Sequence, residues 1–262
     1  MLECVVNVSE GADSSVLHAL REAVRNDLLD VHSDAHHNRS VFTLVGEKAP
    51  RALTRVAVGL LSIATHDGVH PRLGVVDVVP FVPLSGSSMD DALAARQRFA
   101  QWAADELGLP SFLYGPERSL PTIRKNAWTP LFPDVGTREP HSTGGAVCVG
   151  AREPLIAYNV WLQGVSLDET KHIASRVRTE HIRTLGLQVG DFTQVSMNLV
   201  APHIAHPGHA VDSIAQLTPI HHCELVGLIP EDVMTVIPQS RWEALDLSED
   251  RTIEWRLQRR RG

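Results

Sequence analysis

The order of apolar segments near the start of the chain constrains its fold more than any other feature. Short apolar runs alternate there with segments whose apolar side chains recur at helical spacing. We expect a strand at 2–8, a helix capped by Asp13, strands at 28–31 and 40–45, a helix with Pro50 in its first turn, and a strand at 75–82. The buried stripe of the second helix is predicted to be Leu53, Val56, Ala57, Leu60 and Leu61. This order of strand, helix, strand, strand, helix and strand is that of a ferredoxin-like unit.

The same order of elements recurs in the second half of the chain, although no residues match between the halves. Its segments are predicted at 155–162, 166–178, 182–187, 192–200, 210–217 and 223–229. Ser166, followed three residues later by Glu169, is typical of a capping box. The sequence therefore predicts an α+β fold of two ferredoxin-like (βαββαβ) subdomains, residues 1–152 and 153–262, with a ligand cleft between them.

A long helix and a long loop separate the two sets of elements. Ser88 caps a predicted helix that runs to Leu107, and a short strand follows at 111–114. Residues 115–145 are rich in proline, glycine and charge, and a loop of that length in a compact protein is usually functional or disordered. We expect function, because the loop also carries the apolar side chains Leu120, Ile123, Trp128, Leu131 and Phe132. After residue 229 we expect one short helix near 233–245 and then a frayed, solvated end.

The composition argues against several classes of protein. A chain of 262 residues with 43% hydrophobic and 21% charged residues can bury a core, and its formal charge of −7 gives no general attraction for nucleic acid or an anionic membrane. The first residues lack a basic start and an apolar signal core, so we expect a cytoplasmic location. Cys4, Cys148 and Cys223 lie far apart in apolar runs, which indicates buried, reduced thiols.

Residues 66–81 concentrate the groups that could perform chemistry. Two histidines, an arginine and an aspartate lie there on a turn that leads into an apolar strand. Pro71 disfavours a helical conformation at His70, so His66 and His70 do not share a helix face, which weakens a zinc interpretation. An imidazole can take up and return a proton near neutral pH, and the guanidinium of Arg72 can hold a carboxylate. The alternative is that His70 and Arg72 only tie a loop to its neighbours.

Several segments, in order along nearly the whole chain, resemble the formiminotransferase family. They are residues 4–11, 29–31 with 37–41, 66–78, 113–115, 120–124, 133–136, 150–152, 155–159, 194–199 and 224–230. The resemblance implies transfer of a formimino group from N-formimino-L-glutamate to N5 of the co-substrate tetrahydrofolate, a step of histidine degradation and one-carbon metabolism. It also implies two ferredoxin-like subdomains, a folate channel between them, a homodimer and no metal.

The resemblance also suggests site residues. The general base of the family falls on His70, and its folate-contacting loop falls on residues 136–145, with Gly136, His141, Gly144 and Gly145. Arg72 would hold a substrate carboxylate, and Asn38 and Asp77 would orient the substrate or the imidazole. Backbone amides of Gly144 and Gly145 could approach the folate closely.

Departures from the family pattern leave the donor open. Val69 replaces a glutamate before His70, His32 replaces an aspartate, and Val135 and Thr137 interrupt the usual sequence around Gly136. The donor could therefore be formimino- or formylglutamate, and the number of glutamates on the folate is undetermined. No cyclodeaminase domain follows within this sequence.

Two further alternatives remain at this point. A metal hydrolase could use the histidine-rich segments, which contain His36, His37, His203, His206 and His209. A protein that binds folate or an amino acid without turnover is the other, because a shared fold does not secure a shared reaction.

Overall fold

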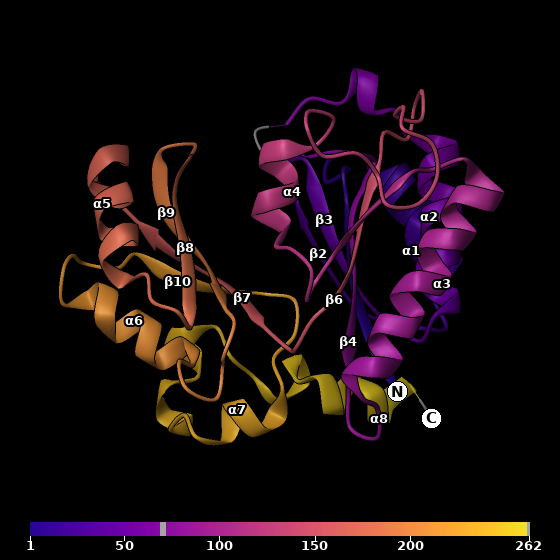
Figure 1. Cartoon of the computed structure of the whole chain (residues 1–262). Helices are drawn as coiled ribbons and strands as arrows, with labels where there is room; N and C mark the ends of the chain where they lie inside the picture. The colour runs from indigo at the N-terminus through magenta and orange to yellow at the C-terminus, as the bar shows by residue number, and fades with distance from the viewer. Residues whose placement is uncertain (69–71, 261–262) are drawn as a thin grey trace. The chain divides into compact units, whose positions relative to one another are not determined.

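The computed structural model describes residues 1–68 and 72–260 of the chain (Figure 1). The predictions for Val69 and His70 fall outside these residues. By its internal contacts the chain divides into two compact units, Met1–Glu153 and Pro154–Gly262. Both units combine a sheet with helices, which confirms the α+β class. The ligand cleft remains a prediction.

The first unit contains a six-stranded sheet in the order β2-β3-β1-β4-β6-β5. Neighbouring strands are antiparallel from β2 to β4, whereas β6 is parallel to both β4 and β5. The strands are β1 (Leu2–Val8), β2 (Leu28–Asp34), β3 (Arg39–Val45), β4 (Val76–Pro83), β5 (Ser111–Tyr114) and β6 (Val147–Ala151). The helices are α1 (Ser14–Val24), α2 (Lys48–Leu60), α3 (Met89–Leu107) and α4 (Leu120–Asn126), with a 3-10 turn at Ile63–Thr65.

Local capping signals place the helices of this unit where the sequence predicts them. The Asp13 carboxylate accepts the amide hydrogens of Ser15 and Val16 at the start of α1. Ser88 and Asp91 form a reciprocal capping box on α3, and Gly108 ends that helix in the left-handed conformation.

Two details of the first unit differ from the prediction. Leu60 is 53% exposed rather than buried, and the last fully buried residue of α2 is Ala57. The strand β6 has no counterpart among the predicted elements. It is a five-residue apolar run directly after a glycine-rich loop, and such a short run shows no periodicity that identifies a strand.

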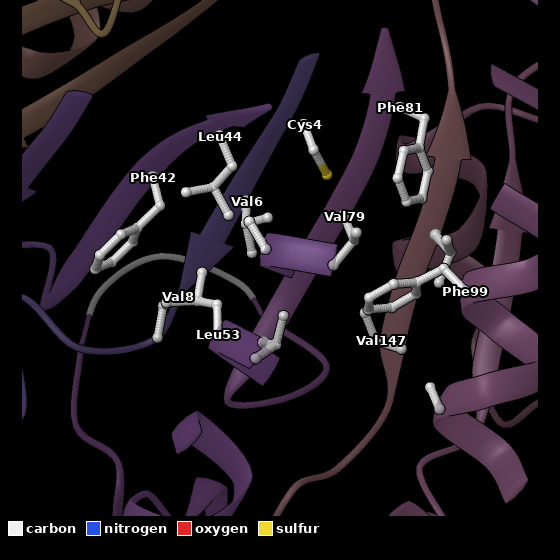
Figure 2. Packing of buried hydrophobic residues seen from close by; sticks show 14 of the residues in the cluster. Cys4, Val6, Val8, Phe42, Leu44, Leu53, Val79, Phe81, Phe99 and Val147 are labelled. Carbon is white, nitrogen blue, oxygen red and sulfur yellow. The ribbon is translucent and has the colours of Figure 1, made fainter. Parts of the chain in front are cut away.

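Apolar side chains bury both faces of the first sheet. On one face, Val6, Phe42 and Phe81 pack with side chains of α1, α2 and α3, including Leu53 and Phe99 (Figure 2). Alternate residues such as Val78, Phe112 and Cys148 form a second cluster with Ile123 of α4. Figure 1 shows α4 on the opposite side of this sheet from α1, α2 and α3. The 115–145 segment is thus partly helical and partly anchored in a core.

The second unit contains an antiparallel four-stranded sheet in the order β10-β7-β9-β8. Its elements begin with β7 (Ile156–Leu162), α5 (Leu167–Val177), β8 (Ile182–Val189), β9 (Phe192–Leu199), α6 (Pro207–Ala215) and β10 (His222–Val226). They continue with α7 (Glu231–Thr235), 3-10 turns at Gln239–Arg241, Glu243–Leu245 and Glu249–Arg251, and α8 (Ile253–Arg260). The predicted element order holds from β7 to β10.

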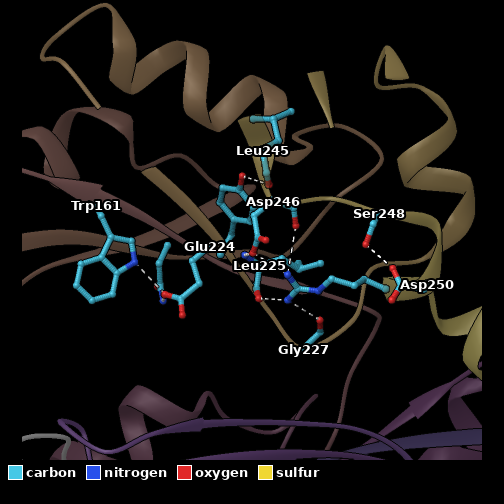
Figure 3. Close-up of polar contacts among 11 residues, drawn as sticks. Trp161, Glu224, Leu225, Gly227, Leu245, Asp246, Ser248 and Asp250 are labelled. Carbon is cyan, nitrogen blue, oxygen red and sulfur yellow. Dashed lines mark hydrogen bonds and ion pairs between the residues drawn. The ribbon is translucent and has the colours of Figure 1, made fainter. Parts of the chain in front are cut away.

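The frayed end predicted after residue 245 is wrong. Residues 253–260 form α8, and Ile253 is 3% exposed. Arg251 orders the preceding turn, because its guanidinium donates to the Asp246 carboxylate and to the carbonyls of Leu225 and Gly227 (Figure 3). The contacts with Leu225 and Gly227 reach more than twenty residues back along the chain, so the local sequence near Arg251 gave no sign of them.

The three cysteines are buried and free, as predicted. Burial raises the pKa of the Cys4 and Cys148 thiols, which makes both poor nucleophiles. Among the described residues, no helix is both long and apolar enough to cross a lipid bilayer.

Candidate functional site

The candidate site is built around Arg72, just before β4. One terminal nitrogen of its guanidinium donates to the Asn38 carbonyl and the other to the His37 carbonyl, both at 3.2 Å. These carbonyls belong to the turn between β2 and β3. Burial lowers the pKa of Arg72, and the charge of Asp77 opposes that shift. Arg72 therefore holds the turn in place as well as bringing a positive charge to the site.

Asn38 joins three segments that are distant in sequence. Its side-chain oxygen accepts the Gly11 amide hydrogen at 2.9 Å, and its side-chain nitrogen donates to the Asp67 carbonyl at 2.8 Å. The residue has φ of +47°, which asparagine tolerates better than most residues. The structure thus places Asn38 as a link between the end of β1, the β2–β3 turn and the segment that precedes Arg72.

Asp77 is a buried carboxylate at the centre of a cluster of guanidinium groups. It is 3% exposed, and its two oxygens accept the Leu73 amide hydrogen at 2.9 Å and a hydrogen from Arg124 of α4 at 2.5 Å. Its charge also raises the pKa values of Arg39 and Arg72 against the effect of burial. A carboxylate this deeply buried needs such partners, because an unpaired charge away from water is costly.

We call Arg39, Arg72 and Arg124 the arginine cluster. Sequence reasoning missed Arg39 and Arg124, although both lie in segments that carry the family resemblance. Burial lowers the pKa of Arg39, and the neighbouring guanidinium of Arg124 adds to that shift. Asp34 and Asp67 also bring negative charge to Arg39 and Arg72, so the cluster is a mixed group of charges. A guanidinium in such a group can hold a carboxylate ligand through paired hydrogen bonds.

The backbone brings the predicted folate loop to the segment that follows Arg72. The Ala146 amide donates to the Leu73 carbonyl at 2.9 Å, and the Val75 amide donates to the Gly144 carbonyl at 3.0 Å. A Cβ on Gly145 would lie 2.2 Å from the Leu73 carbonyl oxygen, and φ at Gly145 is +71°. This close approach requires glycine, which explains the residue at this position.

His141 fixes the conformation of this loop. Its Nδ1 accepts the Gly144 amide hydrogen at 2.9 Å, and its backbone pairs with Gly145 in both directions. The amides of Gly144 and Gly145 thus donate within the loop. Gly136, in contrast, packs against Pro110 and Ala104 near the end of α3. The backbone hydrogen bonds of residues 73–75 with Gly144 and Ala146 bring this end of the loop next to Arg72 and Asp77. Gly136 lies at the other end of the loop.

The imidazole of His66 lies beside Arg72, and the backbone carbonyl of His37 accepts a hydrogen bond from the same guanidinium. Burial, and then the charge of Arg72, lower the pKa of His66, so that this ring is neutral at pH 7. Its Nε2 is buried and has no hydrogen-bond partner among the described residues. His37 contacts the Asp34 carboxylate through Nδ1 at 2.7 Å. Burial raises the pKa of Asp34, but the hydrogen bonds from His37 outweigh this and hold it well below its usual range. The site therefore combines guanidinium groups with the neutral imidazole of His66.

The histidines named for a metal site make other contacts. Within residues 1–68 and 72–260, no group of three or more histidine, cysteine, aspartate or glutamate residues is placed to hold a metal ion. His206 and His209 stack on each other with ring centroids 5.3 Å apart, and His203 lies 3.8 Å from the Asp232 carboxylate.

Comparison with known proteins identifies the family. Residues 1–152 match the model of the formiminotransferase domain, N-terminal subdomain. The chain is 36% identical to the glutamate formimidoyltransferase of Streptococcus pyogenes serotype M1 over 231 residues, which cover 76% of this chain and 77% of that protein. It is 29% identical to the glutamate formimidoyltransferase of Thermoplasma acidophilum over an alignment of 302 residues, with 99% and 98% of the two chains covered.

A longer relative matches over part of its length. The chain is 34% identical over 284 residues to the formimidoyltransferase-cyclodeaminase of Gallus gallus, of which it spans 51%. With a family model that covers more than half of the sequence, and a relative above 30% identity that is covered over most of its length, the chain belongs to the formiminotransferase family, a family of one-carbon-group transferases.

Proposed function

We propose that this protein is a glutamate formimidoyltransferase that moves the formimino group of N-formimino-L-glutamate to N5 of tetrahydrofolate. The observation that carries the proposal is the arginine cluster around Asp77, beside the ladder that joins residues 73–75 to the predicted folate loop. The donor carries two carboxylates, which suit guanidinium groups. The names of the relatives from Streptococcus pyogenes and Thermoplasma acidophilum support the same reaction.

The chemistry requires two proton transfers. The attacking N5 nitrogen loses a proton as its bond to the formimino carbon forms, and the departing glutamate nitrogen gains one as its bond to that carbon breaks. One imidazole can take the first proton and deliver it to the leaving amine, and general acid-base help of this kind contributes about 10²–10⁴-fold. We assign this role to His70, which lies outside the described residues. Positioning of the two substrates contributes the remainder.

The strand orders support a ferredoxin-like fold for each subdomain. If the strands of each βαββαβ set are numbered in chain order, the order across the sheet is 4-1-3-2 for β1 to β4 and again for β7 to β10. In the first unit, β6 and β5 extend this core at the β4 edge. Subdomain boundaries at 152 and 153, a homodimer and a cytoplasmic location remain part of the proposal.

Mixing the purified protein with tetrahydrofolate and each candidate donor tests the proposal. A new pterin absorbance with N-formimino-L-glutamate is the expected result. Product from the formyl donor alone would select a formyltransferase instead. Folate binding without transfer from either donor would select a binding protein.

A substitution tests the assigned base. We expect His70→Ala to lower turnover by roughly 10²-fold or more and to leave folate affinity nearly intact, because the imidazole acts on the transferred proton rather than on binding. His18→Ala, on the exposed side of α1, is the matched control. Unchanged turnover in His70→Ala would remove this residue from the mechanism.

A further inference from the structure

The turn between β2 and β3 holds Arg72 through two of its carbonyl groups. Nη1 of Arg72 donates to the Asn38 carbonyl and Nη2 to the His37 carbonyl, each at 3.2 Å. A guanidinium is planar, so two hydrogen bonds from different nitrogens fix both its position and the direction of its plane. The direction in which Arg72 can meet a ligand therefore depends on the conformation of this turn.

Asp34, the last residue of β2, sets that conformation. Its Oδ1 accepts the His37 amide hydrogen at 2.9 Å, and its Oδ2 lies 2.7 Å from Nδ1 of the His37 ring. An ionised carboxylate is only an acceptor, so Nδ1 carries the hydrogen of this contact. The side chains of Asp34 and His37 are 29% and 9% exposed, and charge-assisted hydrogen bonds sheltered from water are stronger than neutral ones. Asp34 thus binds both the backbone and the ring of the residue whose carbonyl receives Arg72.

Two glycines lie against this turn where a larger residue would not fit. A Cβ on Gly11 would lie 2.3 Å from the Asp34 carbonyl oxygen. A Cβ on Gly68 would lie 2.8 Å from the His37 carbonyl oxygen and 2.7 Å from Nη2 of Arg72. Side chains do not approach backbone atoms this closely, so glycine at both positions allows the tight packing. The turn and the guanidinium are therefore packed together, and a turn that lost its internal hydrogen bonds could not shift without moving Arg72.

We propose that Asp34 and His37 are positioning residues, which act through Arg72 on the binding of the formimino donor. They hold the turn so that its two carbonyls direct the guanidinium at a carboxylate of N-formimino-L-glutamate. This inference rests on the proposed function, which names that donor. Neither side chain needs to touch the substrate or to move a proton. A lysine at position 72 could not be oriented in this way, because an ammonium has no plane to fix.

Isothermal titration of the full-length protein with N-formimino-L-glutamate, without folate, measures this role. We expect Asp34→Ala to weaken the affinity for the formimino donor by about 10-fold, the size of effect that loss of one charge-assisted hydrogen bond gives. The KM for the formimino donor should rise equally while kcat stays nearly constant, because Arg72 binds the substrate and takes no part in proton transfer. Asp34→Asn should stay within about 3-fold of the wild type, because its amide oxygen can accept the His37 amide hydrogen and its amide nitrogen can donate to Nδ1 of the other tautomer.

Asp91→Ala is the matched control. The Asp91 carboxylate accepts the amide hydrogen and the hydroxyl hydrogen of Ser88 at the start of α3, in the same unit. Its loss removes a similar pair of hydrogen bonds at another place in the fold. We therefore expect Asp91→Ala to leave the affinity for the formimino donor unchanged.

A double-mutant cycle shows whether the effect passes through Arg72. Arg72→Lys keeps a positive charge but gives up the planar group that the two carbonyls hold, so Asp34→Ala should weaken the affinity for the formimino donor by less than about 2-fold in that background. His37→Ala, which removes the ring contact and keeps the carbonyl, should weaken this affinity by about 3-fold alone and by less when combined with Arg72→Lys. If Asp34→Ala does not fold, His37→Ala decides the question.

Three results would overturn the inference. They are wild-type affinity for the formimino donor in both Asp34→Ala and His37→Ala, equal losses with and without Arg72→Lys, and a loss in Asp91→Ala as large as that in Asp34→Ala. The transfer assay is read separately. Binding of the formimino donor that depends on Asp34, without formimino transfer, would refute the proposed function and leave the inference standing. Formimino transfer with binding that depends on neither Asp34 nor His37 would do the reverse.

Discussion

Replacement of Asp77 by asparagine tests the central contact of the site. The buried carboxylate accepts hydrogen bonds from Leu73 and Arg124, and it is the counter-charge that offsets the burial of Arg39 and Arg72. Removal of one partner from a buried ion pair costs about 3–5 kcal/mol. Asparagine keeps a hydrogen-bond acceptor and the Arg124 side chain is 19% exposed, so we expect a loss of about 2–3 kcal/mol in the free energy of unfolding.

Urea denaturation followed by circular dichroism measures this loss as a shift of the midpoint at constant slope. The chain has two compact units, and Asp77 lies in the first. The unfolding transition of the first unit is therefore the one to compare, and any separate transition of the second unit should not shift. Arg124→Met and the double variant complete a thermodynamic cycle, in which we expect a coupling energy of about 1 kcal/mol or more. A variant within about 0.5 kcal/mol of the wild type would refute the view that Asp77 stabilises the cluster by its charge.

Two further predictions concern the loop and the response to acid. Gly145→Ala should cost more than the roughly 1 kcal/mol expected of Gly190→Ala, and should lower formimino transfer, because both glycines have positive φ but only the Cβ at 145 would meet the Leu73 carbonyl oxygen. Urea denaturation of both variants measures the difference in their free energies of unfolding. Equal losses of stability would show that the loop moves away from the Leu73 carbonyl without cost. The hydrogen bonds from the buried Arg96 lower the pKa of Glu117 to about 2, below its unfolded value of about 4.3, so this pair stabilises the fold above about pH 4.3 and loses its effect as the pH falls towards 2. Glu117→Gln should therefore flatten the loss of stability between these pH values, and an unchanged acid profile would contradict the assignment.

The local sequence predicted the elements that carry their own signals. Asp13 and Ser88 supply caps from their own side chains, and Gly108 ends α3 because it tolerates a left-handed backbone. The prediction failed where such signals were missing. The strand β6 is too short to show a period, and the turn before α8 is held by Arg251 contacts with residues more than twenty positions away.

The site divides in the same way. The sequence by itself singled out Arg72, Asp77 and the glycine-rich loop 136–145 as candidate site residues, through the residue types and their order, and their roles stay predictions. Only the tertiary structure decided that Arg124 pairs with Asp77, that Asn38 links three segments, and that Gly145 closes on Leu73. Arg124 and Asp77 are 47 residues apart, and no local pattern records which distant charges meet once the sheet has formed. Burial makes these contacts important for stability, because a charge removed from water is costly unless the fold brings a partner to it.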